Sequence, residues 1–229
     1  MVQIKAVGDC GVLVKLGDSI SETVNSKVME LNRKINELST KGLLETVPAF
    51  CSVLVFYDPL KTDFDAVSKV LFQLSESLEG KTGTEGKLVE IPVCYGGSYG
   101  PDLSFVAAHG NITEEEVIRI HSGRDYRIYM LGFLPGFPYL GGMDERIVTP
   151  RLKTPRTRIP AGSVGIGGEQ TGIYPLDSPG GWQLIGRTPY RLFKPEQAGS
   201  PLYETGDSIR FVPISQEEFE EISRKPEKG

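Results

Sequence analysis

A histidine at the end of a predicted helix is the residue of this chain best suited to proton transfer near neutral pH. His121 closes a helix that is expected to begin at Thr113, because Thr113 and Glu116 have the spacing of a capping box. An imidazole changes its charge close to pH 7, so it can donate or accept a proton in catalysis. We expect its side chain to reach the surface of the sheet that follows. The alternative is a helix-end histidine that binds the terminal carbonyl groups.

A run of cations lies further along the chain. Residues 146–160 contain no acidic residue and five cationic ones, namely Arg146, Arg151, Lys153, Arg156 and Arg158. Three prolines in the same run restrict the backbone. A stiff loop that presents Arg and Lys suits a small anionic ligand, and the alternative is an ordinary solvated loop.

Several familiar chemical motifs are excluded by their context. The glycine-rich residues 162–168 precede a predicted strand and turn, whereas the phosphate-binding loop and the dinucleotide fingerprint both need a helix there. Residues 161–165 resemble a nucleophile elbow, but no histidine follows His121 to complete a hydrolase triad. The histidines have no partner at metal-ligand spacing, so no structural metal is expected. Three widely spaced cysteines are expected to be buried free thiols: Cys10, Cys51 and Cys94.

Composition and charge exclude several classes of protein. With 39% hydrophobic and 24% charged residues, the chain has the make-up of a soluble globular protein. The net charge of −5 argues against a general nucleic-acid binder, which needs a basic face to neutralise phosphates. No apolar run approaches the roughly 20 residues of a membrane-spanning helix, and the amino terminus lacks the pattern of a signal peptide. We therefore expect a cytoplasmic protein that contacts neither nucleic acid nor membrane.

The first third of the chain predicts a small α+β domain. Apolar and β-branched runs predict four strands, over residues 2–7, 11–16, 43–47 and 52–57. Helical periodicity predicts two helices, the first capped near Ser19 and the second near Thr62 and Asp65. The order ββαββα indicates an antiparallel sheet covered by two helices. Polar, glycine-rich residues at 80–86 mark a linker, which gives domains of residues 1–83 and 87–229.

The second domain is predicted to be mainly β. After a strand at 88–94 and two short helices, residues 130–189 hold 12 of the 27 glycines and 8 of the 16 prolines. Apolar runs that need burial alternate with these turn residues, which a flexible tether would lack. A late strand at 209–212 and a terminal helix at 215–223 complete the chain. We expect a compact β-domain whose rigid loops can hold ligand groups.

Six motifs occur in order along the chain. They are YGGSYGPDL at 95–103, EVIRIHS at 116–122, MLGFLPGFPYL at 130–140, PRTRIPAGSVG at 155–165, QTGIYP at 170–175 and SPGGWQLIGRT at 178–188. Together they resemble the B subunit of bacterial 5-oxoprolinase, a family also labelled allophanate hydrolase subunit 1 or KipI. The resemblance spans nearly the whole chain. It implies a cyclophilin-like β-barrel over roughly residues 88–214, without implying prolyl isomerase activity.

The resemblance also implies partners and a reaction. Members of the family act with a C subunit, of related cyclophilin-like fold, and with an A subunit to open the lactam of 5-oxo-L-proline to L-glutamate. ATP would be the co-substrate, with Mg, and the chain would be inactive without its partners. No bound organic cofactor is expected. The alternatives are a regulatory protein that inhibits a sensor histidine kinase, and a component of a urea- or allophanate-type amidohydrolase complex.

Within this family, the cations and His121 would serve lactam opening. ATP can activate the amide oxygen as a phosphate ester, which requires cations to hold carboxylate and phosphoryl oxygens. If Arg156 and Arg158 lie on an extended segment, both point to one face and can clamp such anions. We expect catalytic roles for His121 and Arg158. The expected substrate-binding residues are Arg156, Lys153, Tyr129 and Gln183.

Overall fold

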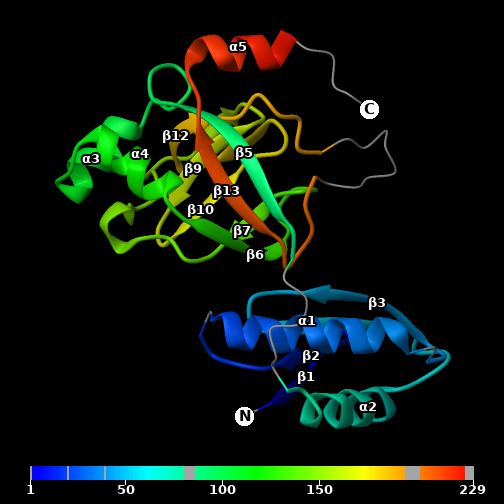
Figure 1. Cartoon of the computed structure of the whole chain (residues 1–229). Coiled ribbons are helices and arrows are strands. Elements are labelled where there is room, and N and C mark those ends of the chain that lie inside the picture. The colour runs from blue at the N-terminus through cyan, green and yellow to red at the C-terminus, as the bar shows by residue number, and fades with distance from the viewer. Residues whose placement is uncertain (1, 20, 39, 80–85, 194–201, 225–229) are drawn as a thin grey trace. The chain divides into compact units, whose positions relative to one another are not determined.

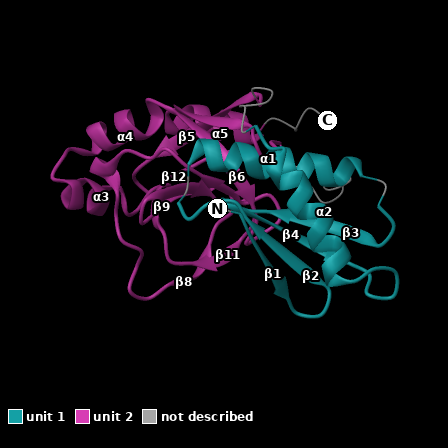
Figure 2. Cartoon of the chain, turned by 90° about the horizontal axis from the view of Figure 1, so that it is seen from below, with its two compact units in different colours: residues 1–85 teal, residues 86–229 magenta. Residues whose placement is uncertain are grey.

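The protein consists of two compact units, residues 1–85 and 86–229, coloured teal and magenta in Figure 2. The computed structural model describes residues 2–19, 21–38, 40–79, 86–193 and 202–224. Apart from Gly86, the predicted linker at 80–86 lies outside the described residues. Among the described helices, none combines the length and the apolar character that crossing a membrane would require.

The amino-terminal unit has the predicted order of elements. Its elements are β1 (Gln3–Val7), β2 (Gly11–Lys15), α1 (Glu22–Glu37), β3 (Leu43–Pro48), β4 (Ser52–Tyr57) and α2 (Phe64–Glu76). The strands form one antiparallel sheet in the order β1-β2-β4-β3. Alternate residues of β2 and β4 are buried, as a one-sided sheet requires. They form a single core with the apolar stripes of both helices, so the predicted α+β domain is confirmed.

The helix caps are shifted from their predicted positions. Ser21, rather than Ser19, caps α1, and its Oγ accepts from the backbone N–H of Val24 at 3.2 Å. Asp63 caps α2 through Ala66 N at 2.8 Å, so neither Thr62 nor Asp65 has that role. The caps lie at Ser21 and Asp63 because a capping side chain must directly precede the first helical residue to reach the free N–H groups of the first turn.

The second unit is a closed β-barrel, as predicted. Its strands follow the order β10-β7-β6-β13-β5-β12-β9. Their bounds are β5 Leu88–Tyr95, β6 Asp125–Leu131, β7 Pro138–Leu140, β9 Ser163–Gly167, β10 Gln170–Ile173, β12 Gln183–Arg187 and β13 Ser208–Pro213. A separate two-stranded ribbon pairs β8 (Arg156–Ile159) with β11 (Ser178–Gly180). The closed barrel agrees with the cyclophilin-like fold that the resemblance implies.

Helices flank this barrel. Figure 1 shows α3 (Leu103–Gly110) and α4 (Glu114–Ser122) together at one side and α5 (Gln216–Arg224) at another. A short 3₁₀ helix, η1, spans Glu145–Ile147. The capping box of α4 is confirmed, since Thr113 Oγ1 accepts from Glu116 N and Glu116 Oε2 accepts from Thr113 N. All three cysteines are free, but only Cys94 is buried, whereas Cys10 and Cys51 are half-buried.

The glycines of the barrel make room for a tryptophan. A Cβ on Gly167 would lie 2.4 Å from Nε1 of Trp182, and a Cβ on Gly172 would lie 3.0 Å from Cζ3 of the same ring. The indole packs at a steep angle against Phe137, with the ring centroids 5.5 Å apart. The glycine-rich residues 162–168 therefore pair as strands and accommodate an indole. Strand β10 follows them directly, so they lack the helix that a nucleotide loop requires.

Candidate functional site

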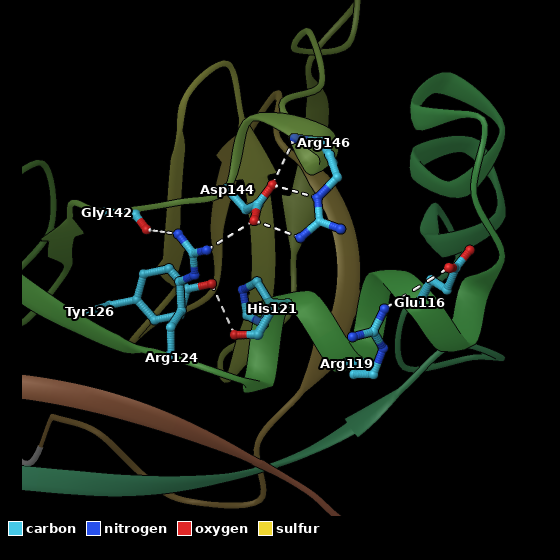
Figure 3. A network of polar contacts seen from close by, with 8 residues as sticks. All are labelled: Glu116, Arg119, His121, Arg124, Tyr126, Gly142, Asp144 and Arg146. Atoms are coloured by element: carbon cyan, nitrogen blue, oxygen red, sulfur yellow. Dashed lines mark hydrogen bonds and ion pairs between the residues drawn. The ribbon is translucent and has the colours of Figure 1, made fainter.

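His121 lies inside the barrel unit and has no exposed surface. Its Nδ1 lies 2.8 Å from the hydroxyl of Tyr95, and its Nε2 lies 2.8 Å from Oγ1 of Thr171. The ring stacks on Phe211 with a centroid distance of 4.4 Å. The backbone carbonyl of His121 accepts from the hydroxyl of Tyr126 (Figure 3).

The hydrogen bonds define one tautomer of His121. Thr171 donates its hydroxyl proton to the carbonyl of Gly165 at 3.1 Å, so its Oγ1 accepts from the ring. Nε2 of His121 therefore carries the proton, and Nδ1 accepts from Tyr95. Burial lowers the pKa of His121 to about 3 and raises the pKa of Tyr95 well above its ordinary value. At neutral pH the ring is neutral and Tyr95 remains a donor.

His121 reaches the barrel strands, as expected, but its ring is buried there and is not open to a substrate. Val117 and His121 are four residues apart on α4, so they share one helical face, and both are buried. The imidazole links α4 to β5 and β10. A general acid or base must come within hydrogen-bond distance of substrate. Because its ring is enclosed and both nitrogens are bonded, we assign His121 a structural role.

Arg146 is held by an acidic residue close to it in sequence. Asp144 accepts from the Arg146 backbone N–H, Nε and Nη2 at 2.9–3.0 Å, and from Nη2 of Arg124 at 2.9 Å (Figure 3). The bonds from Arg146, with smaller help from the charge of Arg124, hold the pKa of Asp144 well below its usual range. This network connects the start of β6 to η1. Arg146 is therefore paired with Asp144 and is not a candidate for binding an anionic ligand.

Arg156 and Arg158 do not form the predicted clamp. Strand β8 confirms their extended backbone, but Arg156 donates to Asp102 at 2.7 Å and to the carbonyl of Trp182 at 3.3 Å. The second oxygen of Asp102 accepts from Leu184 N at 2.6 Å. Arg158 donates through Nε and Nη2 to one oxygen of Asp177, at 2.9 and 2.7 Å. Each guanidinium therefore has its own carboxylate partner.

Replacing Arg158 by alanine should have little effect on either stability or turnover. The Arg158 side chain is 78% exposed, and an exposed ion pair contributes less than about 1 kcal/mol to the free energy of unfolding. We expect substrate turnover by the assembled complex to stay within about twofold, because Asp177 already binds this guanidinium. Urea denaturation and a turnover assay measure the two effects. A loss of turnover beyond tenfold at unchanged stability would restore a catalytic role for Arg158.

Gln183 and Tyr129 are buried rather than open to substrate. Nε2 of Gln183 donates to the carbonyl of Pro150 at 2.9 Å. Leu152 N donates to the carbonyl of Gly181 at 2.7 Å, so the cationic residues 146–160 are attached to the start of β12 at two points. Tyr129 lies where a side chain on residue 141 would be, because a Cβ on Gly141 would come within 1.8 Å of its ring. Both predicted substrate contacts are thus packing and positioning residues in this structure.

Two cations of residues 146–160 have no ion pair among the described residues, and an exposed aromatic residue is linked to one of them through ring contacts. Lys153 has no ion pair among the described residues, and the guanidinium of Arg151 lies 5.8 Å from the centroid of Trp182. Phe133 is 61% exposed and lies 5.5 Å, centroid to centroid, from Phe137, which contacts Trp182. We call Phe133, Arg151 and Lys153 the aromatic-basic surface.

A cleft that no sequence motif predicted lies between the end of β12 and α5. It has a volume of about 250 Å³, and its lining includes Pro175, Arg187, Pro189, Tyr190 and Phe219. Arg187 belongs to the SPGGWQLIGRT motif, but its position there does not indicate that it borders a cleft. Among the described residues, no group of three or more His, Cys, Asp or Glu side chains is placed to hold a metal ion.

Comparisons with known proteins agree on one family. Residues 2–202 match the family described as carboxyltransferase domain, subdomain C and D. The chain is 44% identical to the 5-oxoprolinase B subunit of Bacillus subtilis, over 95% of each chain. It is 41% identical to the protein of the same name from Escherichia coli O157:H7, over 90% of this chain and 94% of that one.

Other similar proteins include longer ones. Urea amidolyase of Lachancea kluyveri is 26% identical over 100% of this chain, which covers 14% of that protein. The solved structure of TTHA0988 superposes with a TM-score of 0.78 at 35% identity, covering 90% of this chain and 40% of that one. PH0987 from Pyrococcus horikoshii is 50% identical, with a TM-score of 0.57, over 95% of this chain and all of the other. The chain therefore belongs to the carboxyltransferase subdomain C and D family, within the group of 5-oxoprolinase B subunits.

Proposed function

We propose that this chain is the B subunit of an ATP-dependent 5-oxoprolinase complex, which opens the lactam of 5-oxo-L-proline to give L-glutamate. The observation that carries the proposal is the 44% identity to a 5-oxoprolinase B subunit over 95% of both chains. The aligned residues include both the amino-terminal unit and the barrel. The proposed setting is the cytoplasm.

The proposed role of ATP is to activate the lactam. An unstrained amide resists water at neutral pH, and phosphoryl transfer to its oxygen makes the ring carbon open to attack. In this chain the glycine-rich residues 162–168 enclose Trp182 and do not suit a phosphate group. Lys153 is an expected substrate-binding cation that has no ion pair among the described residues. We therefore retain Lys153 as a contact for an anionic group in the assembled enzyme.

The proposed partners are the C and A subunits, and the aromatic-basic surface is the proposed contact with them. Interface centres are rich in aromatic residues and arginine, and Phe133 and Arg151 supply both. Phe133 has a φ of 62°, in the left-handed region that a phenylalanine rarely adopts. Backbone strain at an exposed aromatic residue is typical of a binding segment held in place by its neighbours.

A second candidate substrate class is urea or allophanate. The matches to urea amidolyases extend over the full length of this chain, although at only 25–26% identity. A substrate panel separates the two classes. The three co-purified subunits, supplied with ATP and Mg, should release glutamate from 5-oxo-L-proline at least a hundredfold faster than ammonia from urea or allophanate. The reverse order would replace the first proposal by the second.

A further inference from the structure

The cleft beside β12 carries a cation that is held in place but not neutralised. Nε of Arg187 donates to the carbonyl of Ala161 at 2.9 Å, which orients the guanidinium. Its Nη groups have no ion pair or hydrogen-bond partner among the described residues. Because this arginine is half-buried and lines the cleft, those two groups are available to a ligand there.

The acidic residue near Arg187 is already satisfied. Asp177 Oδ1 accepts from Ala161 N at 2.8 Å, and Oδ2 accepts both bonds from Arg158. The Ala161 N–H, then Arg158, and to a smaller degree the charges of Arg158 and Arg187, hold the pKa of Asp177 below its ordinary value. Asp177 thus pairs with Arg158 and makes no ion pair with Arg187, so the charge of Arg187 is not neutralised by this carboxylate. A cation held at the wall of a cleft in this way favours an anionic ligand.

The remaining walls of the cleft are largely apolar. Pro175, Pro189, Tyr190 and Phe219 contribute rings, and the rest of the lining is two cations and three small residues: Arg187, Arg191, Ala161, Thr188 and Ser223. A volume of about 250 Å³ is below the range of roughly 300–1,000 Å³ that drug-sized ligands occupy. The cleft therefore suits a small molecule that combines one carboxylate with a compact apolar body.

We propose that this cleft binds the carboxylate of a small organic acid, with the Nη groups of Arg187 as the carboxylate ligands. A planar guanidinium and a carboxylate match in a two-bond geometry that an ammonium group cannot reproduce. The choice of acid rests on the proposed function: 5-oxo-L-proline joins one carboxylate to a five-membered ring. Tyr190 and the prolines face the ring, and Arg187 holds the acid group.

Calorimetric titration of the full chain with 5-oxo-L-proline tests this proposal. Arg187→Met keeps an unbranched side chain and removes the guanidinium, so affinity should fall at least tenfold. The affinity of Arg187→Lys should lie between those of the wild type and Arg187→Met. The matched control is Arg119→Met, which removes an exposed arginine on α4 and should bind like the wild type. The neutral lactam 2-pyrrolidinone, which lacks the carboxylate, should bind at least tenfold more weakly. Equal affinity of wild type and Arg187→Met would overturn the proposal, as would the absence of saturable binding.

A measurement on the wild type removes any dependence on variant folding. On addition of 5-oxo-L-proline, the amide NMR signals of Ala161, Thr188 and Tyr190 should shift, whereas shifts confined to other parts of the chain would contradict the proposed site. The inference and the proposed function can fail separately. An active complex in which this chain shows no binding here refutes the cleft alone. Binding lost in Arg187→Met, with a complex inactive on 5-oxo-L-proline, refutes the proposed function alone.

Discussion

Replacing His121 by alanine should lower the free energy of unfolding by about 3–5 kcal/mol. The ring has no exposed surface, stacks on Phe211 and makes hydrogen bonds at both nitrogens. Its removal leaves a cavity and the unpaired hydroxyl of Tyr95. Urea denaturation measures the loss. Tyr95→Phe and Thr171→Val each remove one of the bonds and should cost about 1–2 kcal/mol.

The same histidine should make stability depend on pH. Its pKa is about 3 in the folded chain, against an ordinary value of 6.5. Between these values the unfolded chain binds one proton more than the folded chain, so stability falls as pH falls through this window. The slope is about 1.4 kcal/mol per pH unit. In His121→Gln the part of the pH dependence that comes from the imidazole should disappear, while the part that comes from the carboxylates should remain. Two results would show that the ring is not enclosed as described. One is the same slope of stability against pH, between pH 6 and 4, in His121→Gln and in the wild type. The other is a loss of less than about 1 kcal/mol in the free energy of unfolding of His121→Ala.

Replacing Phe133 by glycine should weaken assembly with the partner subunits by about thirtyfold or more, the effect of losing a central aromatic contact worth about 2 kcal/mol. The substitution should leave stability of the free chain within about 1 kcal/mol. Glycine adopts the φ of 62° without strain, and this gain offsets its greater freedom in the unfolded chain. A lower affinity can therefore be assigned to the lost side chain.

Titration of this chain, carrying a fluorescent label, with its partner subunits measures the effect. Phe105→Ala is the matched control, because Phe105 is also an exposed aromatic residue of the barrel unit, at 50% exposure, but lies on α3. Affinity in this control should match that of the wild type. If Phe133→Gly assembles as tightly as the wild type, the aromatic-basic surface is not the contact.

Local patterns predicted the elements well because their causes are local. The capping box of Thr113 and Glu116, the alternation in β4 and the periodicity of α1 each depend on neighbouring residues. Even the burial of His121 had a local signal, since Val117 precedes it by one helical turn. An apolar residue at that spacing predicts a shared buried face, which outweighs the tendency of a helix-end histidine to lie in solvent.

The site could not be predicted in the same way because its pairings are distant. Asp102 precedes Arg156 by 54 residues, and Asp177 follows Arg158 by 19. The spacing of two suggested a clamp only on the condition that the segment is extended; β8 meets that condition, but the spacing did not indicate which carboxylate would pair with each guanidinium. The cleft at Arg187 is lined by residues at the end of β12 and by residues of α5. These two segments are far apart in the sequence and come together only in the folded chain. Inhibition of a histidine kinase stays a prediction.

Glutamate release from 5-oxo-L-proline by the purified subunits, with and without this chain, tests the central claim most directly. With ATP and Mg present, we expect release from the complete set and a fall of at least a hundredfold when this chain alone is omitted. Adding the purified chain back should restore the rate. A rate that is the same with and without this chain would contradict its assignment as a component of the enzyme.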